Sequence, residues 1–115
     1  MNIDKDLVAA MATPLVLAIL AEDTSYGYAI LKRVRELSAG DVEWTDGMLY
    51  PLLHRLERLG YIRAEWSASP EGRRRRNYEI TQVGVEQLAV QRKQWVAATR
   101  TLGGLWGSSL SVAGA

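Results

Sequence analysis

The strongest chemical signal in the sequence is a concentration of arginine between His54 and Arg76. This stretch holds seven arginines against three glutamates, so its formal charge is +4, whereas the whole chain of 115 residues is only +1. Four of the arginines are consecutive, from Arg73 to Arg76. Such a run is too polar for a core, and fixed surface charge of this sign attracts a polyanion, of which DNA is the most common.

Other chemistries find little support. The chain has no cysteine and a single histidine, His54, which excludes disulfides and thiol catalysis and argues against a histidine-rich metal site. No Ser/His/Asp arrangement, phosphate-binding loop or paired-carboxylate motif is visible. We therefore expect no enzyme, no cofactor and no metal, and we interpret His54 as a DNA-facing helix residue and not as a base.

A helix followed by a β-hairpin is predicted around these arginines. Thr45 or Asp46 can cap the helix and Gly60 can end it. One helix face is apolar, through Leu49, Leu52, Leu53, Leu56 and Leu59. The apolar period then changes to two, as in half-buried strands, at Ile62, Ala64 and Trp66 and again at Tyr78 and Ile80. This order predicts a winged helix-turn-helix, mainly α with a small antiparallel β-wing.

The opposite face of the helix and the arginine run form the predicted DNA-binding surface. Its candidates are Thr45, Asp46, Gly47, Tyr50, Pro51, His54, Arg55, Arg58, Arg73, Arg74, Arg75 and Arg76. The alternatives without a role in DNA binding are that Tyr50 is a core aromatic and that Arg55 and Arg58 pair with Glu57. We prefer the DNA interpretation because these side chains share one side with the arginine-rich wing, which we place at the hairpin tip.

Four ordered blocks of the sequence resemble the PadR family of transcriptional regulators, in its short, multidrug-regulator-like subgroup. The blocks are Tyr26-Gly27-Tyr28-Ala29-Ile30, Leu49-Tyr50-Pro51-Leu52-Leu53-His54-Arg55-Leu56-Glu57, Gly60-Tyr61-Ile62 and Gly72-Arg73-Arg74-Arg75-Arg76-Asn77-Tyr78-Glu79-Ile80-Thr81. The resemblance covers roughly residues 8 to 102. It implies a ligand-responsive repressor that binds a pseudo-palindromic operator as a homodimer, and it keeps Pro51 inside a helix with a local bend.

The first half of the chain predicts two more helices. Asp4 can cap a helix that runs to Ala21, with either a kink before Pro14 or a restart at Thr13. This helix is apolar on nearly every side, so we expect a second subunit to cover it. It lacks the flanks of an export signal and is too short to span a bilayer, which needs ~20 residues, so we expect a cytoplasmic protein without membrane contact.

A second helix is predicted to begin at a Ser25 cap. Its apolar stripe comprises Tyr26, Ile30, Val34 and Leu37. The short apolar run from Val42 to Trp44 could add an edge strand to the wing, and Trp44 by itself suggests a core anchor.

The last predicted helix is capped by Thr81 and runs to about Leu102. Its apolar stripe is about five turns long, which is more than a compact domain covers alone, so we expect a dimerisation arm, as the resemblance also implies. We therefore divide the chain into a DNA-binding domain (1–80), a dimerisation helix (81–102) and a flexible tail (103–115).

The resemblance also suggests a ligand site, because in multidrug-binding relatives a tryptophan at the place of Trp95 stacks on flat ligands between subunits. The candidates are Leu7, Met11, Leu88, Gln91, Arg92, Trp95 and Thr99. After Glu86 the chain has no Asp or Glu, so Arg92 would favour a neutral or anionic planar aromatic effector over a cation. The alternatives are that Trp95 only packs between subunits and that Arg92 pairs with Asp4, Asp6 or Glu22.

These observations predict a DNA-binding transcriptional regulator. The competing class is a winged helix used for protein interaction without sequence-specific DNA binding. That class would show an apolar wing or an apolar exposed helix face, and neither is apolar in this sequence.

Overall fold

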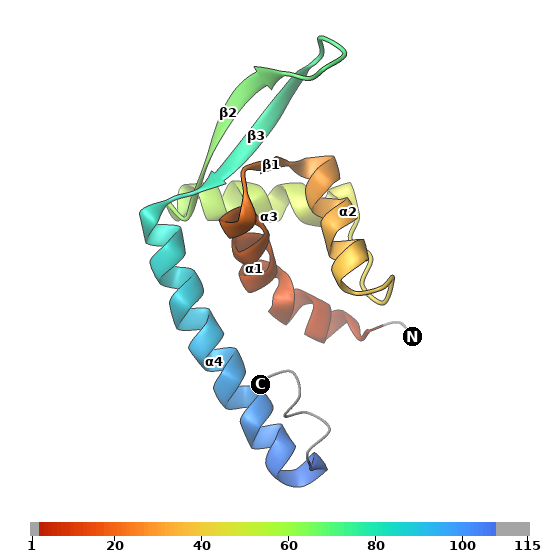
Figure 1. The fold of residues 1–115 in the computed structure, drawn as a ribbon, viewed down its shortest axis with the longest axis vertical. Helices are drawn as coiled ribbons and strands as arrows, with labels where there is room; N and C mark the ends of the chain where they lie inside the picture. Colours follow the sequence, from red (N-terminus) through yellow and green to blue (C-terminus); the bar gives the residue numbers. More distant parts are fainter. Residues whose placement is uncertain (1–2, 108–115) are drawn as a thin grey trace.

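The computed structural model describes residues 3–107. Its helices are α1 (Lys5–Glu22), α2 (Gly27–Leu37), α3 (Asp46–Arg58) and α4 (Gln82–Trp106), and its strands are β1 (Ser25–Tyr26), β2 (Ile62–Ala68) and β3 (Arg74–Ile80) (Figure 1). The helices form the body, the β2–β3 hairpin projects from it, and α4 extends away in another direction (Figure 1). The predicted fold class, mainly helical with an antiparallel wing, is confirmed.

The sheet has three antiparallel strands in the order β1-β3-β2. Its third strand is the Ser25–Tyr26 segment, so the predicted strand at Val42 to Trp44 is wrong. Val42 and Trp44 are instead buried in an irregular segment. Ser25 is likewise not the cap of α2, because its backbone pairs with Tyr78 of β3 and the cap position falls on Tyr26, which makes no side-chain cap bond.

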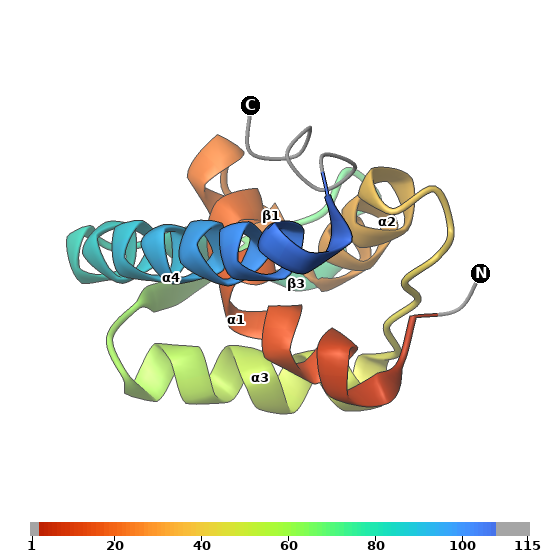
Figure 2. The same ribbon diagram turned by 90° about the horizontal axis from the view of Figure 1, so that it is seen from below.

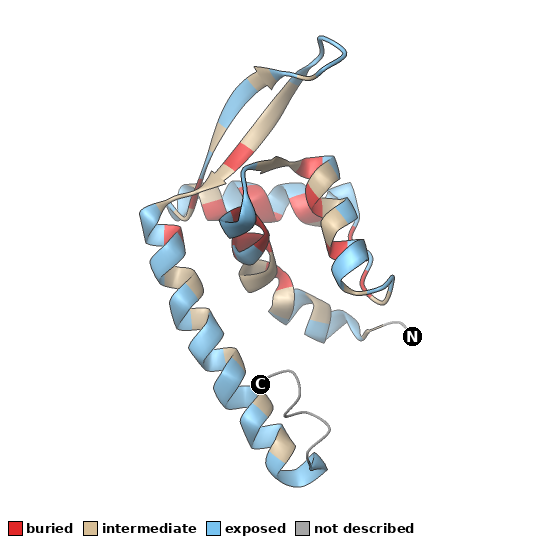
Figure 3. Cartoon of the chain, viewed as in Figure 1, coloured by how far each residue is buried: buried red, intermediate tan, exposed pale blue. Residues whose placement is uncertain are grey.

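The core lies where α1, α2 and α3 meet the base of the sheet, as the red inward faces in Figure 3 show. Its fully buried members include Leu17, Ile30, Leu49, Leu53 and Tyr78. Burial is also the main reason why the pKa of the Tyr78 phenol is raised above its usual value.

Three residues that the sequence placed on apolar faces are exposed, namely Leu37 (51%), Leu59 (53%) and Trp66 (59%). Leu37 is the last residue of α2 and Leu59 the C-cap of α3, so both lie where their helices leave the core. Trp66 pairs with Arg76, the first β3 residue beyond the stretch that β1 covers, so it lies on the two-stranded part of the wing. Periodicity gives a face correctly but does not indicate where the core beneath it ends.

The predicted caps of three helices are confirmed. The side chains of Asp4, Thr45 and Thr81 accept from the N–H groups of Asp6, Met48 and Gly84, at 3.0, 3.3 and 3.1 Å. Helix α1 continues through Pro14, so of the two alternatives the restart at Thr13 is wrong. Figures 1 and 2 show that α1 changes direction partway along. Pro51 also lies inside its helix, as the resemblance implies.

Helix α4 begins as predicted but ends at Trp106 and not at Leu102, because the N–H of Gly107 still donates to the carbonyl of Gly103 at 2.8 Å. The rest of the predicted tail, 108–115, lies outside the described residues. Within α4 only Gly84 is buried, and the distal half passes beyond the body (Figures 1 and 3). None of the helices in residues 3–107 is long and apolar enough to cross a membrane.

Candidate nucleic-acid interface

Helix α3 presents the predicted residues on its outer face. Leu49, Leu52, Leu53 and Leu56 are buried against the body, and this orients the opposite side outward. The exposed set comprises Thr45, Asp46, Gly47, Tyr50, Pro51, His54, Arg55 and Arg58. Seen from below, α3 lies at the edge of the helical body, and no other described helix lies beyond its outer side (Figure 2).

Tyr50 connects this face to the start of α2. Its side chain is 39% exposed, so the alternative of a core aromatic is wrong. Its hydroxyl lies so close to Gly27, the first residue of α2, that a Cβ at that position would collide with it. The glycine therefore lets the first turn of α2 approach the outer face of α3.

The two arginines of α3 differ in their surroundings. Arg55 donates through Nη2 to Thr13 Oγ1 of α1 at 3.2 Å, so its side chain bends towards the helix that lies beside α3. For Arg58 the described residues show no ion pair. Glu57 pairs with Arg76 of the wing. The alternative that Glu57 pairs with Arg55 or Arg58 is therefore wrong.

The arginine run does not form one patch at the hairpin tip, as the sequence suggested. Arg73 belongs to the turn, where its N–H donates to Ser69 Oγ at 3.1 Å, and the other three begin β3. Side chains alternate along a strand, so Arg74 and Arg76 lie over Trp66, with their Cζ atoms 4.6 and 5.9 Å from the ring centroid. Arg75 points to the other face, with its Cζ 3.7 Å from the ring centroid of Tyr26. These long-range partners left no signal in the local sequence.

A separate apolar groove of about 350 Å³ lies between α1 and α4. It brings together four of the predicted ligand residues, namely Met11, Leu88, Arg92 and Trp95. Leu7, Gln91 and Thr99 do not line it, and the hydroxyl of Thr99 donates to the Trp95 carbonyl at 2.9 Å. The lining residues that the sequence analysis missed are Pro14, Leu15 and Ala18, which follow Met11 at helical spacing and could have been found from it.

Arg92 meets no carboxylate in this groove. No acidic side chain lines it, and the described residues show no ion pair of Arg92. Of the three predicted partners, Asp4 caps α1, Asp6 lies in its first turn and Glu22 binds Arg33 at 2.8 Å, and none of them lines the groove. The guanidinium therefore contributes positive charge to an otherwise apolar surface.

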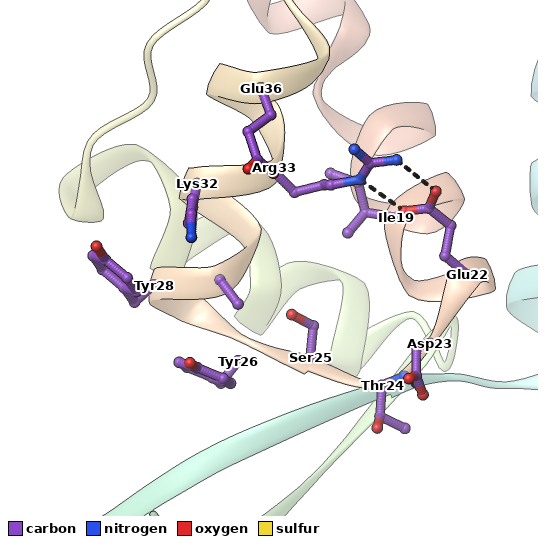
Figure 4. Close-up of a pocket in the computed structure, with 11 residues that line it drawn as sticks. Ile19, Glu22, Asp23, Thr24, Ser25, Tyr26, Tyr28, Lys32, Arg33 and Glu36 are labelled. Atoms are coloured by element: carbon purple, nitrogen blue, oxygen red, sulfur yellow. Dashed lines mark hydrogen bonds and ion pairs between the residues drawn. The ribbon is translucent and has the colours of Figure 1, made fainter.

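The Glu22–Arg33 pair borders a second hollow of about 320 Å³, where the end of α1, β1 and α2 meet (Figure 4). Hydrogen bonding by Arg33 lowers the pKa of the Glu22 carboxyl, and the same bond raises the pKa of the guanidinium. The two charges neutralise each other at an exposed site, so the pair contributes little to stability and offers little free charge to a ligand.

Comparison with known proteins yields one consistent relationship. The sequence model of the family described as "Transcriptional regulator PadR-like family" matches residues 16–90. An uncharacterized protein X of Lysinibacillus sphaericus is 26% identical over 90 residues, which is 78% of this chain and 83% of that protein.

Solved structures agree with this match. A transcriptional regulator from Clostridium thermocellum is 26% identical, with a TM-score of 0.81 over 89% of this chain and 96% of that one. A PadR-like transcriptional regulator from Bacillus cereus is also 26% identical, with a TM-score of 0.78 over 90% and 98% of the two chains. A structure from Streptococcus mutans is 31% identical, with a TM-score of 0.75 over 86% and 90%.

Proposed function

This chain belongs to the PadR-like family of transcriptional regulators, and from this premise we propose that it is a ligand-responsive repressor that binds a pseudo-palindromic operator as a homodimer. Members of this family are DNA-binding regulators of transcription and not enzymes. What the proposal adds is the direction of regulation, the response to a ligand, the form of the operator and the assembly. We place its action in the cytoplasm, because its DNA target would lie there.

The observation that carries the proposal is the outer face of α3, which is polar, exposed and continuous with an arginine-rich wing. Two copies would insert their α3 helices into successive major grooves about one helical turn apart. Tyr50 and His54 would face base edges or the backbone, and the wing would reach the neighbouring phosphates or the minor groove. The full proposed contact set is Thr45, Asp46, Gly47, Tyr50, Pro51, His54, Arg55, Arg58, Arg73, Arg74 and Arg75, whereas Arg76, the last residue of the predicted run, is held by Glu57.

The homodimer is supported by apolar surface that the described chain leaves uncovered. The groove between α1 and α4 is open, and the stripe of α4 that lines it continues past the body through Leu102 (41% exposed) and Trp106 (63% exposed). A second copy related by two-fold symmetry would cover both surfaces. In this arrangement Leu7 and Thr99, which lie outside the groove of one chain, could border a shared site.

The proposed effector is a planar aromatic molecule that stacks on Trp95 between the subunits. Because Arg92 brings an unpaired positive charge to the groove and no carboxylate lines it, the site would favour a neutral or anionic ligand over a cation. The competing interpretation of Trp95 is that it only packs against the second subunit.

A gel shift on the DNA upstream of the protein's own coding sequence tests the proposal. Binding should survive an excess of mixed-sequence duplex and should weaken steeply as salt is raised, because phosphate contacts release counterions. The competing function, a winged helix for protein interaction, predicts no specific shift at any salt concentration. The same gel with an inducing ligand should show release of the DNA.

A further inference from the structure

Arg76 differs from the other arginines of the run because a carboxylate already holds it in the free protein. Its Nη2 lies 2.9 Å from Glu57 Oε2, and the two side chains are only 33% and 31% exposed. Its Nε is buried and has no hydrogen-bond partner among the described residues. The guanidinium therefore lies inside the junction between the wing and α3, and not on an open surface.

The ion pair lies at the point on the wing where β1 no longer pairs with β3. Strand β1 pairs with β3 only at Asn77 and Tyr78, so from Arg76 to the turn the wing is a ribbon of two strands. Two-stranded ribbons are marginally stable and strongly twisted by themselves. Arg76 is the first residue of this ribbon beyond Asn77, and it reaches back to the last turn of α3.

We infer that the Glu57–Arg76 ion pair sets the angle between the wing and α3, so that Arg76 is a positioning residue for DNA binding and not a phosphate ligand. A phosphate contact by Arg76 would require it to leave a half-buried carboxylate, and Glu57 would then face the DNA unpaired. The wing's contacts with phosphate would accordingly come from the other arginines of the run, of which Arg73 and Arg74 are exposed. This inference rests on the proposed function, because it assumes that α3 and the wing bind the same operator.

Charge-altering variants at both positions separate positioning from direct contact. The probe is an operator duplex recovered from random sequence with the wild-type protein, and its affinity is measured over a salt series. Glu57→Gln removes a negative charge beside the DNA, so simple electrostatics predicts tighter binding. Positioning predicts the opposite, with Glu57→Gln and Arg76→Gln each weakening operator binding, by roughly threefold to tenfold if their coupling is typical of a contacting pair.

The double variant Glu57→Arg with Arg76→Glu keeps the net charge and restores an ion pair in reverse. We expect it to recover operator affinity to within about twofold of the wild type, as pairwise coupling requires. The dependence of affinity on salt should stay unchanged in Arg76→Gln, whereas the control Arg73→Gln should make it shallower by about 0.9. Thermal unfolding of each variant checks that the chain still folds.

Tighter binding by Glu57→Gln together with a shallower salt dependence of Arg76→Gln would identify Arg76 as a phosphate ligand and overturn the inference. A well-folded double variant that binds no more tightly than Arg76→Gln would do the same. Both results would leave the proposed function intact, since the wild type would still bind its operator. A wild type that binds no duplex would overturn the proposed function, and this inference with it.

Discussion

Replacing Arg73 and Arg74 together by alanine should remove two phosphate contacts and little else. Arg73 lies in the turn with its side chain exposed, and Arg74 is exposed beside the Trp66 ring, 4.6 Å from its centroid. An exposed contact of this kind is worth about 0.5–1 kcal/mol. The double variant should therefore remain folded, with a free energy of unfolding within about 1 kcal/mol of the wild type.

The effect on DNA binding follows from counterion release. Each phosphate contact contributes about 0.9 to the slope of log affinity against log salt, so two contacts should make the slope shallower by about 1.8. At 0.15 M salt each contact is then worth about 0.9RT ln(1/0.15), or about 1 kcal/mol. Losing both should weaken binding by about 2 kcal/mol, which is roughly 30-fold.

Fluorescence anisotropy on the operator and on a mixed-sequence duplex, each over a salt series, measures both quantities. The loss should be similar for the two duplexes, because phosphate contacts carry no sequence information. A matched control is Arg35→Ala with Arg100→Ala, which removes two exposed charges from the last turn of α2 and the distal half of α4. A control that weakens binding as much, or an unchanged slope in the wing variant, would refute the assignment.

Four further predictions concern the rest of the account. His54→Ala should change the free energy of unfolding by no more than about 0.5 kcal/mol and yet alter operator binding; a large loss of stability with intact binding would show that α3 faces the other way. Sedimentation should give a dimer at micromolar concentration, and truncation before Arg92 should give an aggregated or unfolded chain; a stable monomer would contradict the packing argument. Tryptophan fluorescence titrations should show tighter binding of anionic aromatic acids than of cationic dyes, and Trp95→Ala should abolish it; tighter, Trp95-dependent binding of the cations would overturn the effector proposal. Gly84→Ala should destabilise the fold by about 1–3 kcal/mol, because its Cβ would collide with a backbone carbonyl, whereas Gly104→Ala meets open space and should not; equal melting temperatures would count against this packing.

Local signals in the sequence predicted local structure well. The caps at Asp4, Thr45 and Thr81 were predictable because each side chain binds an N–H only two or three residues further along. The buried leucines of α3 were predictable for a similar reason, since helical spacing fixes their common face. The outward direction of Tyr50 and His54 followed from them.

Features that depend on distant partners could not be predicted in the same way. The strand at Ser25–Tyr26 exists because β3 offers an unpaired edge, and two residues are too few to show a period. The arginine run suggested a single phosphate patch, but Arg76 is held by a glutamate 19 positions away. The groove was partly predicted, because the resemblance pointed to Trp95, and Met11, Leu88 and Arg92 were named with it. The remaining α1 residues that line it, Pro14, Leu15 and Ala18, were missed although they follow Met11 at helical spacing.

Selection of operators from random duplexes by the wild-type protein tests the central claim most directly. If two α3 helices bind one face of the DNA, the enriched sequences should share an inverted repeat with half-site centres about 10 base pairs apart. Hydroxyl-radical footprints should then show protection on that same face, and Tyr50→Ala with His54→Ala should lose the enrichment while keeping weak, salt-dependent binding. Enrichment of no sequence, or of a single site without symmetry, would contradict the account.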